Sequence, residues 1–292
     1  MYLATPLHST KTIYIPNATN EEIITHLHKK GYDLSIIDSY ILRYMGKVLP
    51  GWVSVGKKEI NRVEFLHKIT SNSSHINKIT LIPGETLEIF FEDLSYKYDY
   101  NKTVLFEQYY QYSPYKEAGI LPDTYFVPQG IREKNLIKYL TRFANNRYKH
   151  IATKEFKDYN TTKFNRILSI ASIVQKEAAS NQEMPKIASV IYNRLKKRMR
   201  LQMDGTLNYG KYSHIKVTPK RIDDDNTTYN TYKHKGLPDY PVCSVSLSAI
   251  NAALHPAKTP YLYFMRNKKG YHDFSTNYKT HRKNIKKVKK DK

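Results

Sequence analysis

This chain of 292 residues is long enough to form more than one buried core, and its hydrophobic content of 40% excludes a disordered protein. Its formal net charge of +22 favours an anionic partner or surface, although a general compositional bias towards lysine explains a basic chain equally well. Cys243 is the only cysteine in the sequence, which excludes an intrachain disulfide and argues against a cysteine-based metal centre.

The N-terminal residues are predicted to form a small α/β region. Short apolar runs that end at proline or glycine are typical of strands, and apolar residues spaced three or four apart are typical of helices. The predicted elements are a strand at 12–16, a helix from Thr19 or Asn20 to Gly31, a helix at 35–45, a strand at 52–55 and a helix at 61–69.

A strand, a Pro-Gly turn and a helix cap are predicted at 77–86. The helix that follows takes its apolar face from Leu87, Phe90, Phe91 and Leu94. This unit therefore predicts a further strand–turn–helix module.

The middle of the chain is predicted to be helical. Residues 99–116 are rich in tyrosine, which either stacks on sugars or, more commonly, packs in a core. An amphipathic helix is predicted at 135–149, and the polar composition of 148–163 predicts a flexible connector.

Two helices follow, at 164–179 and 183–198, with a break at 180–182. On the first helix, Glu177 shares one face with the apolar residues at 170, 173 and 174, which precede it by seven, four and three positions. Burial at the edge of such a stripe raises the pKa of a carboxyl group, as a general acid near neutrality requires. A glutamate near the end of a helix is more commonly a surface residue or an ion-pair partner, and periodicity alone favours that alternative.

Several sequence motifs occur in a consistent order along the chain. They are found at 121–125, 171–177, 187–195, 199–206, 229–232, 236–238, 252–257 and 261–264. In sequence and order they resemble the endolytic lytic transglycosylases of bacterial cell walls, the YceG-like (MltG) family. The resemblance covers residues 120–281, which is more than half of the chain.

The resemblance implies an α+β fold in three parts. We predict an N-terminal region at 1–98 that includes a LysM-like module at about 50–98, a helical connector at 99–162 and a mixed helix and sheet catalytic domain at 163–292. A LysM-like module implies docking to glycan strands, and the alternative is a spacer without a binding role.

The resemblance also implies that Glu177 is the catalytic acid for cleavage of the MurNAc-β-1,4-GlcNAc bond in nascent peptidoglycan strands. Glu177 would protonate the bridging oxygen and then deprotonate the C6 hydroxyl of the same sugar. That hydroxyl attacks C1 and leaves a 1,6-anhydroMurNAc end. Because water is not the nucleophile, this scheme needs no second carboxylate of the kind that glycoside hydrolases use.

The predicted substrate-binding residues are Asn193, Gln202, Asp204, Tyr229 and Tyr232. Each has a structural alternative: Asn193 would hold a loop, Asp204 would cap a turn, and Gln202 would satisfy backbone groups. We predict no metal and no cofactor, because the acidic run at 223–225 has no second cluster to complete a metal shell.

The C-terminal part is predicted to form a hairpin from strands at 261–264 and 271–275. His281 matches a family histidine near the C-terminus. The lysine-rich residues 283–292 are predicted to form a solvated tail.

The resemblance implies an N-terminal membrane helix that this sequence does not contain, with residues 2–4 as its tail. No stretch of the sequence has the roughly 20 apolar residues that cross a bilayer. Either the anchor preceded residue 1, or the chain is an unusual relative without an anchor. We favour the first explanation, and expect a single-pass protein of the cytoplasmic (inner) membrane with its catalytic domain in the periplasm and peptidoglycan synthases as partners.

Two other classes of function compete with this hypothesis. A basic nucleic-acid-binding protein would explain the charge, but the lysines are spread along the chain and no RNA-binding signature is present, so we predict no nucleic acid partner. A non-catalytic peptidoglycan-binding scaffold would keep the glycan partner and leave Glu177 without a chemical role.

Overall fold

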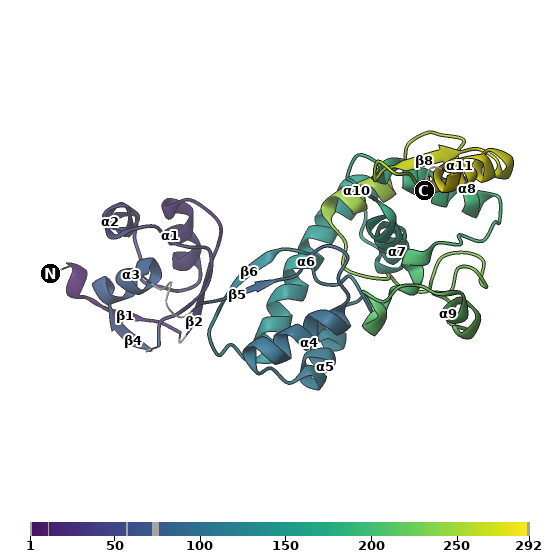
Figure 1. The fold of residues 1–292 in the computed structure, drawn as a ribbon. Helices are drawn as coiled ribbons and strands as arrows, with labels where there is room; N and C mark the ends of the chain where they lie inside the picture. Colours follow the sequence, from purple (N-terminus) through teal and green to yellow (C-terminus); the bar gives the residue numbers. More distant parts are fainter. Residues whose placement is uncertain (1, 11, 57, 72–75, 291–292) are drawn as a thin grey trace. The chain divides into compact units, whose positions relative to one another are not determined.

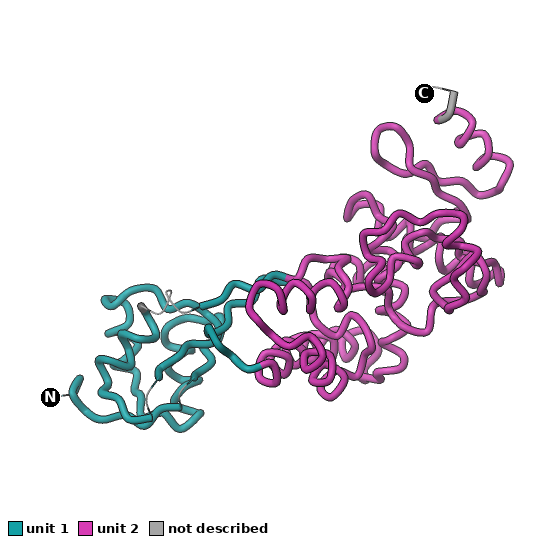
Figure 2. Tube along the Cα trace, turned by 60° about the horizontal axis from the view of Figure 1, so that its bottom comes forward, with its two compact units in different colours: residues 1–80, 123–132 teal, residues 81–122, 133–292 magenta. Residues whose placement is uncertain are grey.

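The computed structural model describes most of the chain, namely residues 2–10, 12–56, 58–71 and 76–290. Two compact units are present (Figure 2), with unit 1 formed by 1–80 and 123–132 and unit 2 by 81–122 and 133–292. Residues 72–75 of the predicted LysM-like segment and 291–292 of the predicted tail lie outside the described residues.

Unit 1 is a small α/β region, as predicted, and its strands pair antiparallel as β1–β4, β2–β3 and β5–β6. Its elements are a 3-10 turn at Tyr2–Ala4, β1 (Pro6–His8), β2 (Thr12–Ile15), α1 (Asn20–Lys29), α2 (Ile36–Met45), β3 (Gly51–Ser54), β4 (Glu59–Asn61), α3 (Arg62–Ser71), β5 (Ile76–Thr80) and β6 (Thr124–Pro128).

Local polar contacts fix the helix starts of unit 1. The predicted cap at Thr19 is confirmed, because its side chain and that of Glu22 form a reciprocal capping box at the start of α1. At α2 the carboxylate of Asp38 accepts from the backbone N–H of Ser35 at 2.8 Å and from the buried guanidinium of Arg62 at 2.7 Å. The hydroxyl of Tyr2 also donates to Asp38, at 2.9 Å, so residues 2–4 are tied to this unit.

Unit 2 is mostly helical (Figure 1). Its elements are α4 (Leu87–Tyr98), α5 (Lys102–Tyr112), α6 (Glu133–Phe156), α7 (Thr161–Glu177), α8 (Met184–Lys196), the 3-10 turns η3 (Asp204–Leu207) and η4 (Gly210–Tyr212), α9 (Pro219–Asp224), α10 (Leu247–Leu254), β7 (Tyr263–Arg266), β8 (His272–Ser275) and α11 (Tyr278–Lys290). The predicted C-terminal hairpin is present as the antiparallel pair β7–β8.

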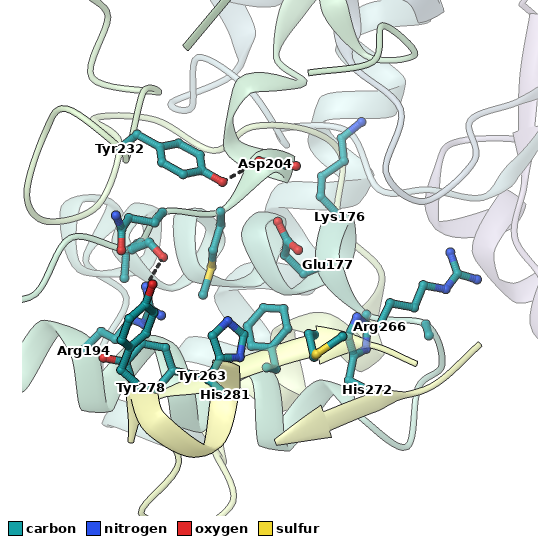
Figure 3. A pocket seen from close by; sticks show the side chains of 17 residues that line it. Lys176, Glu177, Arg194, Asp204, Tyr232, Tyr263, Arg266, His272, Tyr278 and His281 are labelled. Atoms are coloured by element: carbon teal, nitrogen blue, oxygen red, sulfur yellow. Dashed lines mark hydrogen bonds between the residues drawn. The ribbon is translucent and has the colours of Figure 1, made fainter. Parts of the chain in front are cut away.

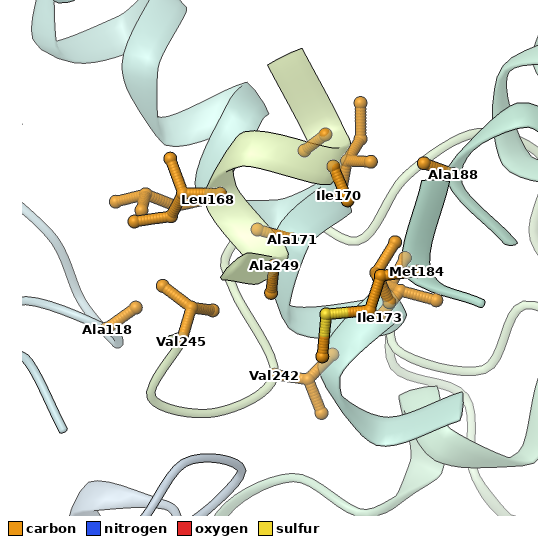
Figure 4. Close-up of a cluster of buried hydrophobic side chains, with 14 of the residues drawn as sticks. Ala118, Leu168, Ile170, Ala171, Ile173, Met184, Ala188, Val242, Val245 and Ala249 are labelled. Atoms are coloured by element: carbon orange, nitrogen blue, oxygen red, sulfur yellow. The ribbon is translucent and has the colours of Figure 1, made fainter. Parts of the chain in front are cut away.

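Helix α7 lies at the centre of the unit 2 core (Figure 4). Every residue from 168 to 174 is buried, so the helix is enclosed on all sides for nearly two turns. It packs against α8 and α10, and Leu168, Ile170 and Ile173 are all fully buried in the same cluster as Ala249. This packing holds the C-terminal end of α7, where Glu177 lies.

The compact units divide the chain differently from the predicted boundaries at 98 and 162. Helix α4 belongs with unit 2, whereas β6, which lies beyond it in sequence, pairs with β5 in unit 1. Taken together, the described residues form a mixed helix and strand structure, consistent with the predicted α+β class.

One predicted irregular segment is largely helical, and that prediction was wrong. The segment at 148–163 is not a flexible connector, because α6 continues to Phe156 through the buried Tyr148 and Ala152 and α7 begins at Thr161. The tail residues at 283, 286 and 287 are exposed, in line with the predicted solvated end, and they belong to helix α11, which continues to Lys290. Beyond residue 149 the apolar residues of α6 are sparse among polar ones, which conceals the helical periodicity of that part in the sequence.

Candidate active site

A cavity of about 580 Å³ lies at the C-terminal end of α7 in unit 2. In Figure 3, Glu177, Asp204 and Tyr232 lie on one side of it, and Tyr263, His272 and His281 lie on the other. The cavity is lined by Lys176, Glu177, Ala178, Ala179, Arg194, Leu201, Gln202, Met203, Asp204, Tyr232, Tyr263, Phe264, Met265, Arg266, His272, Tyr278 and His281.

Glu177 is the last residue of α7, and its half-buried side chain reaches this cavity. Burial raises the pKa of Glu177 to about 7, an effect to which the nearby carboxylate of Asp204 adds and which a hydrogen bond from the Gly205 N–H opposes. The neighbouring Lys176 turns its ammonium group to the hydroxyl of Ser213, at 3.0 Å. Among the described residues no ion pair of Glu177 is present, so the ion-pair alternative for this residue is not supported.

Gly205 gives Glu177 a backbone hydrogen-bond donor. Its N–H donates to Oε1 of Glu177 at 2.8 Å. A Cβ atom at position 205 would lie 2.7 Å from that oxygen and 2.7 Å from Cβ of Lys176, so only glycine allows this close approach without a shift of neighbouring atoms. The prediction from sequence did not include Gly205, because nothing in the sequence shows which carboxylate its backbone approaches.

Three of the predicted substrate-binding residues, Gln202, Asp204 and Tyr232, line the cavity with Glu177. The hydroxyl of Tyr232 donates to Oδ1 of Asp204 at 2.6 Å. Gln202 has a φ of 51°, in the left-handed region that a non-glycine residue rarely adopts, and its N–H donates to the carbonyl of Thr231 at 3.2 Å. The motifs at 199–206 and 229–232 are therefore joined directly in the structure.

The other two predicted substrate-binding residues do not line this cavity. The amide of Asn193 donates to the carbonyls of Thr259 and Tyr261 at 2.8 and 2.9 Å, as the loop-holding alternative predicts. The ring of Tyr229 stacks on Tyr209, with 4.2 Å between the ring centroids. Both side chains are thus engaged in fixing segments that lead to the cavity.

Arg194 is a cavity residue that the sequence prediction missed. Its buried guanidinium donates to three backbone carbonyls, at 2.6 Å to Leu262, 3.1 Å to Arg200 and 2.6 Å to Leu201. Burial lowers the pKa of Arg194 from its ordinary value. The sequence does contain a signal, because Arg194 follows Ile187 and Ile191 on the apolar face of α8 at i+7 and i+3.

Two histidines from the C-terminal elements complete the opposite wall. His272 on β8 contacts Oε2 of Glu183 through Nδ1 at 2.9 Å, and its backbone N–H donates to the same carboxylate at 2.7 Å. His281 on α11 stacks on Tyr263 at 5.2 Å between ring centroids. Burial, with the nearby Arg194 as a second cause, lowers the pKa of His281 and favours its neutral form.

The cavity brings together few groups that could hold a cation. Among the described residues no group of three or more histidine, cysteine, aspartate or glutamate side chains is arranged to hold a metal ion. In the acidic run at 223–225, the side chain of Asp225 accepts hydrogen bonds from Tyr209 and Thr227. The cavity thus offers a carboxyl group with a raised pKa, that of Glu177, beside hydrogen-bonding side chains, and such a group can exchange a proton with a bound ligand.

The family model described as the YceG-like family matches residues 13–287. This chain belongs to the YceG-like family. The match includes both the cavity and most of unit 1. Membership is therefore shown for almost the whole length of the chain.

Relatives of this YceG-like chain include proteins named endolytic murein transglycosylase. The Bacillus subtilis protein is 37% identical over 169 residues, which cover 57% of this chain and 46% of that protein. The Streptococcus pneumoniae strain D39 protein is 32% identical over 176 residues, covering 58% of this chain and 31% of that protein. The match thus spans less than half the length of either relative.

A crystal structure of a YceG-like protein from Listeria monocytogenes has a similar fold. It is 27% identical to this chain, with a TM-score of 0.60, and the match covers 94% of this chain and 99% of that one. No helix among the residues described here combines the length and the apolar composition that crossing a membrane requires.

Proposed function

We propose that this chain is an endolytic lytic transglycosylase of peptidoglycan, in which Glu177 acts first as general acid and then as general base. The bond cleaved is the β-1,4 link between MurNAc and GlcNAc, and the product carries a 1,6-anhydroMurNAc end. The main support is one observation: the carboxyl group of Glu177 lies in a cavity at the end of a buried helix, where burial raises its pKa to about 7. The names of the two relatives agree with this activity.

The environment of Glu177 suits both proton transfers. With a pKa near the working pH, a large fraction of the carboxyl groups is protonated and able to donate to the bridging oxygen. Once the proton has left, the N–H of Gly205 stabilises the carboxylate, which can then remove the proton of the C6 hydroxyl. Glu177 returns to its protonated state as the anhydro ring closes.

In this proposal Asp204 does not act as a second catalyst. Its Oδ1 accepts the hydroxyl of Tyr232, and its charge contributes to the raised pKa of Glu177. We assign direct contacts with the sugars to Gln202, Asp204 and Tyr232. Asn193 and Tyr229 contribute indirectly, through the segments that they hold.

The proposal is tested by incubating the purified protein with peptidoglycan strands and analysing the new ends by mass spectrometry. We expect 1,6-anhydroMurNAc ends, and a loss of at least about 10³-fold in rate for Glu177→Gln. Asp204→Asn is the matched control, because it removes the other carboxylate of the cavity but leaves the proton donor in place. We expect it to keep measurable activity, with the alkaline limb of its pH profile moved to lower pH.

Three outcomes would contradict the proposal. Products with reducing ends would show a hydrolase, in which water is the nucleophile. An Asp204→Asn variant as inactive as Glu177→Gln would show that two carboxylates are needed. Full activity of Glu177→Gln would remove the catalytic role of that residue and favour a non-catalytic, wall-binding scaffold.

The proposed substrate also sets the proposed location. Peptidoglycan lies outside the cytoplasmic membrane, so unit 2 would act in the periplasm or on the outer surface. We include membrane anchoring by an N-terminal helix, and peptidoglycan synthases as partners, in the same proposal. Membrane fractionation of the native protein in its own cells, followed by extraction with salt or detergent, tests the anchoring.

We also propose a glycan-docking role for the LysM-like segment at about 50–98. Truncation at residue 98 is a poor test, because it would remove α4 from the compact fold of unit 2. Tyr96 on α4 is a better target, because its side chain is 88% exposed and can be replaced without disturbing the core. A Tyr96→Ala variant with unchanged affinity for glycan strands would argue against docking through this helix.

A further inference from the structure

Helix α11 presents an uninterrupted cationic face to solvent. Its 13 residues include no aspartate or glutamate. The cations with exposed side chains are Lys279, Arg282, Lys283, Lys286 and Lys287. They fall at i, i+3, i+4, i+7 and i+8, the spacing of a single helix face, and are called the cationic row below.

The opposite face of α11 is occupied. Half-buried residues recur at 281, 284, 285 and 288, the spacing of a single helix face, and the helix packs against β7 and β8. The ring of Tyr263 on β7 contacts His281 at 5.2 Å and Tyr278 at 5.9 Å between ring centroids. The cationic row is therefore held in one orientation by the hairpin.

The first turn of α11 lies at the rim of the candidate active site. Tyr278 and His281, from the first turn of α11, line the same cavity as Glu177 (Figure 3). At a rise of about 1.5 Å per residue, the row from Lys279 to Lys287 extends about 12 Å from that turn. Arg282 and Lys286 follow the cavity residue Tyr278 at i+4 and i+8, so a ligand that leaves the cavity past Tyr278 can reach Arg282 first and the rest of the row around the helix.

The cations of the row have no carboxylate partners among the residues that the structure describes. Arg282 contacts only the ring of Tyr278, at 6.0 Å from its centroid, in the part of the chain that the structure describes. The lining of the cavity adds three basic side chains, those of Lys176, Arg194 and Arg266. It contains two acidic side chains, those of Glu177 and Asp204. Unpaired positive charge beside a cavity raises the local concentration of anionic ligands.

We infer that the exposed face of α11 binds the carboxylates of the peptides that peptidoglycan strands carry, while the glycan lies in the cavity. This inference rests on the proposed function and names the substrate class for the same site: peptide-bearing strands in preference to strands stripped of peptide. Lysine ammonium groups on flexible stems suit carboxylates whose positions vary along a strand. An anionic lipid surface is a weaker fit, because the apolar face that would enter a bilayer packs on the hairpin instead.

The test measures binding, so that it does not depend on catalysis. Glu177→Gln protein is titrated with fluorescently labelled strands that carry peptides and with the same strands after enzymatic removal of the peptides. The α11 variant carries Lys283→Gln, Lys286→Gln and Lys287→Gln. The matched control carries Lys134→Gln, Lys149→Gln and Lys154→Gln, which remove the same charge from exposed positions on α6.

For the α11 variant we expect the Kd for peptide-bearing strands to rise about tenfold, with a shallower dependence on salt, and the Kd for stripped strands to change by less than about twofold. The α6 control should bind both kinds of strand like its parent. Circular dichroism checks that both triple variants keep their helical content. Because the parent is already inactive, these Kd values do not depend on whether the protein cleaves strands.

Several results would overturn the inference. An equal rise in Kd for both triple variants would show a general effect of net charge. An equal rise for peptide-bearing and stripped strands would place the contact on the sugars. Unchanged Kd values, with binding to anionic lipid vesicles lost in the α11 variant alone, would assign the face to a membrane surface.

The failure of the proposed function gives a different result. If wild-type protein yields no anhydro ends while the effect of the α11 variant on Kd persists, the proposed function fails and the binding role of the α11 face stands.

Discussion

At the scale of single residues, the burial that gives Glu177 a raised pKa also lowers the stability of the fold at neutral and alkaline pH. The pKa of its carboxyl group rises from an ordinary value of 4.5 to about 7, mainly because of burial. The folded protein therefore binds this proton more tightly than the unfolded chain does. The resulting contribution to stability is fully present below about pH 4.5 and is lost as the pH rises through about 7.

Replacement of Glu177 by glutamine should reveal this conflict in the free energy of unfolding. We expect Glu177→Gln to be more stable than the parent by about 2 kcal/mol at about pH 8, and equally stable at about pH 4. This is less than the full shift in pKa would give, because the carboxylate keeps contact with water in the cavity. Urea titrations at both pH values measure the difference.

Glu117 is a second carboxyl group with a raised pKa, and its effect must be separated from that of Glu177. Burial raises the pKa of Glu117 to about 8, so it gives both proteins the same trend with pH and cancels in their difference. A stabilisation of the same size at both pH values would show that glutamine acts through packing or hydrogen bonding, and not through the lost charge.

Gly205 is the second residue whose replacement is informative. In Gly205→Ala the new methyl group must displace the carboxylate of Glu177 or the stem of Lys176, because both lie 2.7 Å from the position of Cβ. We expect kcat/KM for strand cleavage to fall at least about 100-fold, since the proton donor leaves its position. The melting temperature and the circular dichroism spectrum should stay close to those of the parent. Parent-like cleavage would show that the carboxylate adapts freely.

The two residues also show how far a sequence can predict a site. The position of Glu177 at the edge of the apolar stripe follows from residue spacing, and the structure has Ile170, Ile173 and Val174 buried as that spacing predicts. Gly205 approaches Glu177 across 28 positions of sequence, a distance over which no local pattern carries information. Local periodicity therefore places Glu177 at the edge of the buried stripe but gives no sign of its hydrogen-bond donor, and only the family resemblance predicted a catalytic role for Glu177.

At the scale of elements, Arg194 connects three pieces of backbone around the cavity. Its side chain joins α8 to the loop at 200–201 and to Leu262, the residue before β7. In Arg194→Lys a single ammonium replaces a fork that reaches three carbonyls, so at least one of them is left without its donor. We expect a loss of about 2 kcal/mol in stability and a higher KM for strand cleavage.

The matched control for this prediction is Arg198→Lys. Arg198 follows α8 on the same segment, and its side chain is exposed. Thermal unfolding and initial rates should leave this control unchanged while both readouts move for Arg194→Lys. Equal behaviour of the two variants would mean that the backbone contacts of Arg194 contribute little to the shape of the cavity.

Elements were predictable from the sequence where an apolar face is dense and a cap residue is present. Thr19 and Ser35 both cap helices near the predicted starts. Helix α11 has only Ile285 and Val288 as aliphatic residues, and its register is fixed by aromatic contacts with β7. Such a helix depends on tertiary packing, which a propensity argument does not contain.

At the scale of the whole molecule, the chain leaves unit 1 after β5 and returns to it at β6. Thr80 and Thr124 are register partners in the β5–β6 pair, although the sequence between them includes α4 and α5 of unit 2. Contiguous boundaries at 98 and 162 cannot express this arrangement. Pairing between distant strands is decided by tertiary contacts, so composition along the chain does not reveal it.

Each unit has a hydrophobic core of its own, which leads to a prediction about unfolding. Leu66 is fully buried in the core of unit 1, and Leu168 is fully buried in that of unit 2. We expect Leu66→Ala and Leu168→Ala each to lower one calorimetric transition by more than about 5 °C and to leave the other in place. Since Glu177 and the residues lining its cavity belong to unit 2, strand cleavage at about 25 °C should persist in Leu66→Ala while its own transition falls. A single transition that both substitutions lower equally would instead mean that the two cores unfold as one cooperative system.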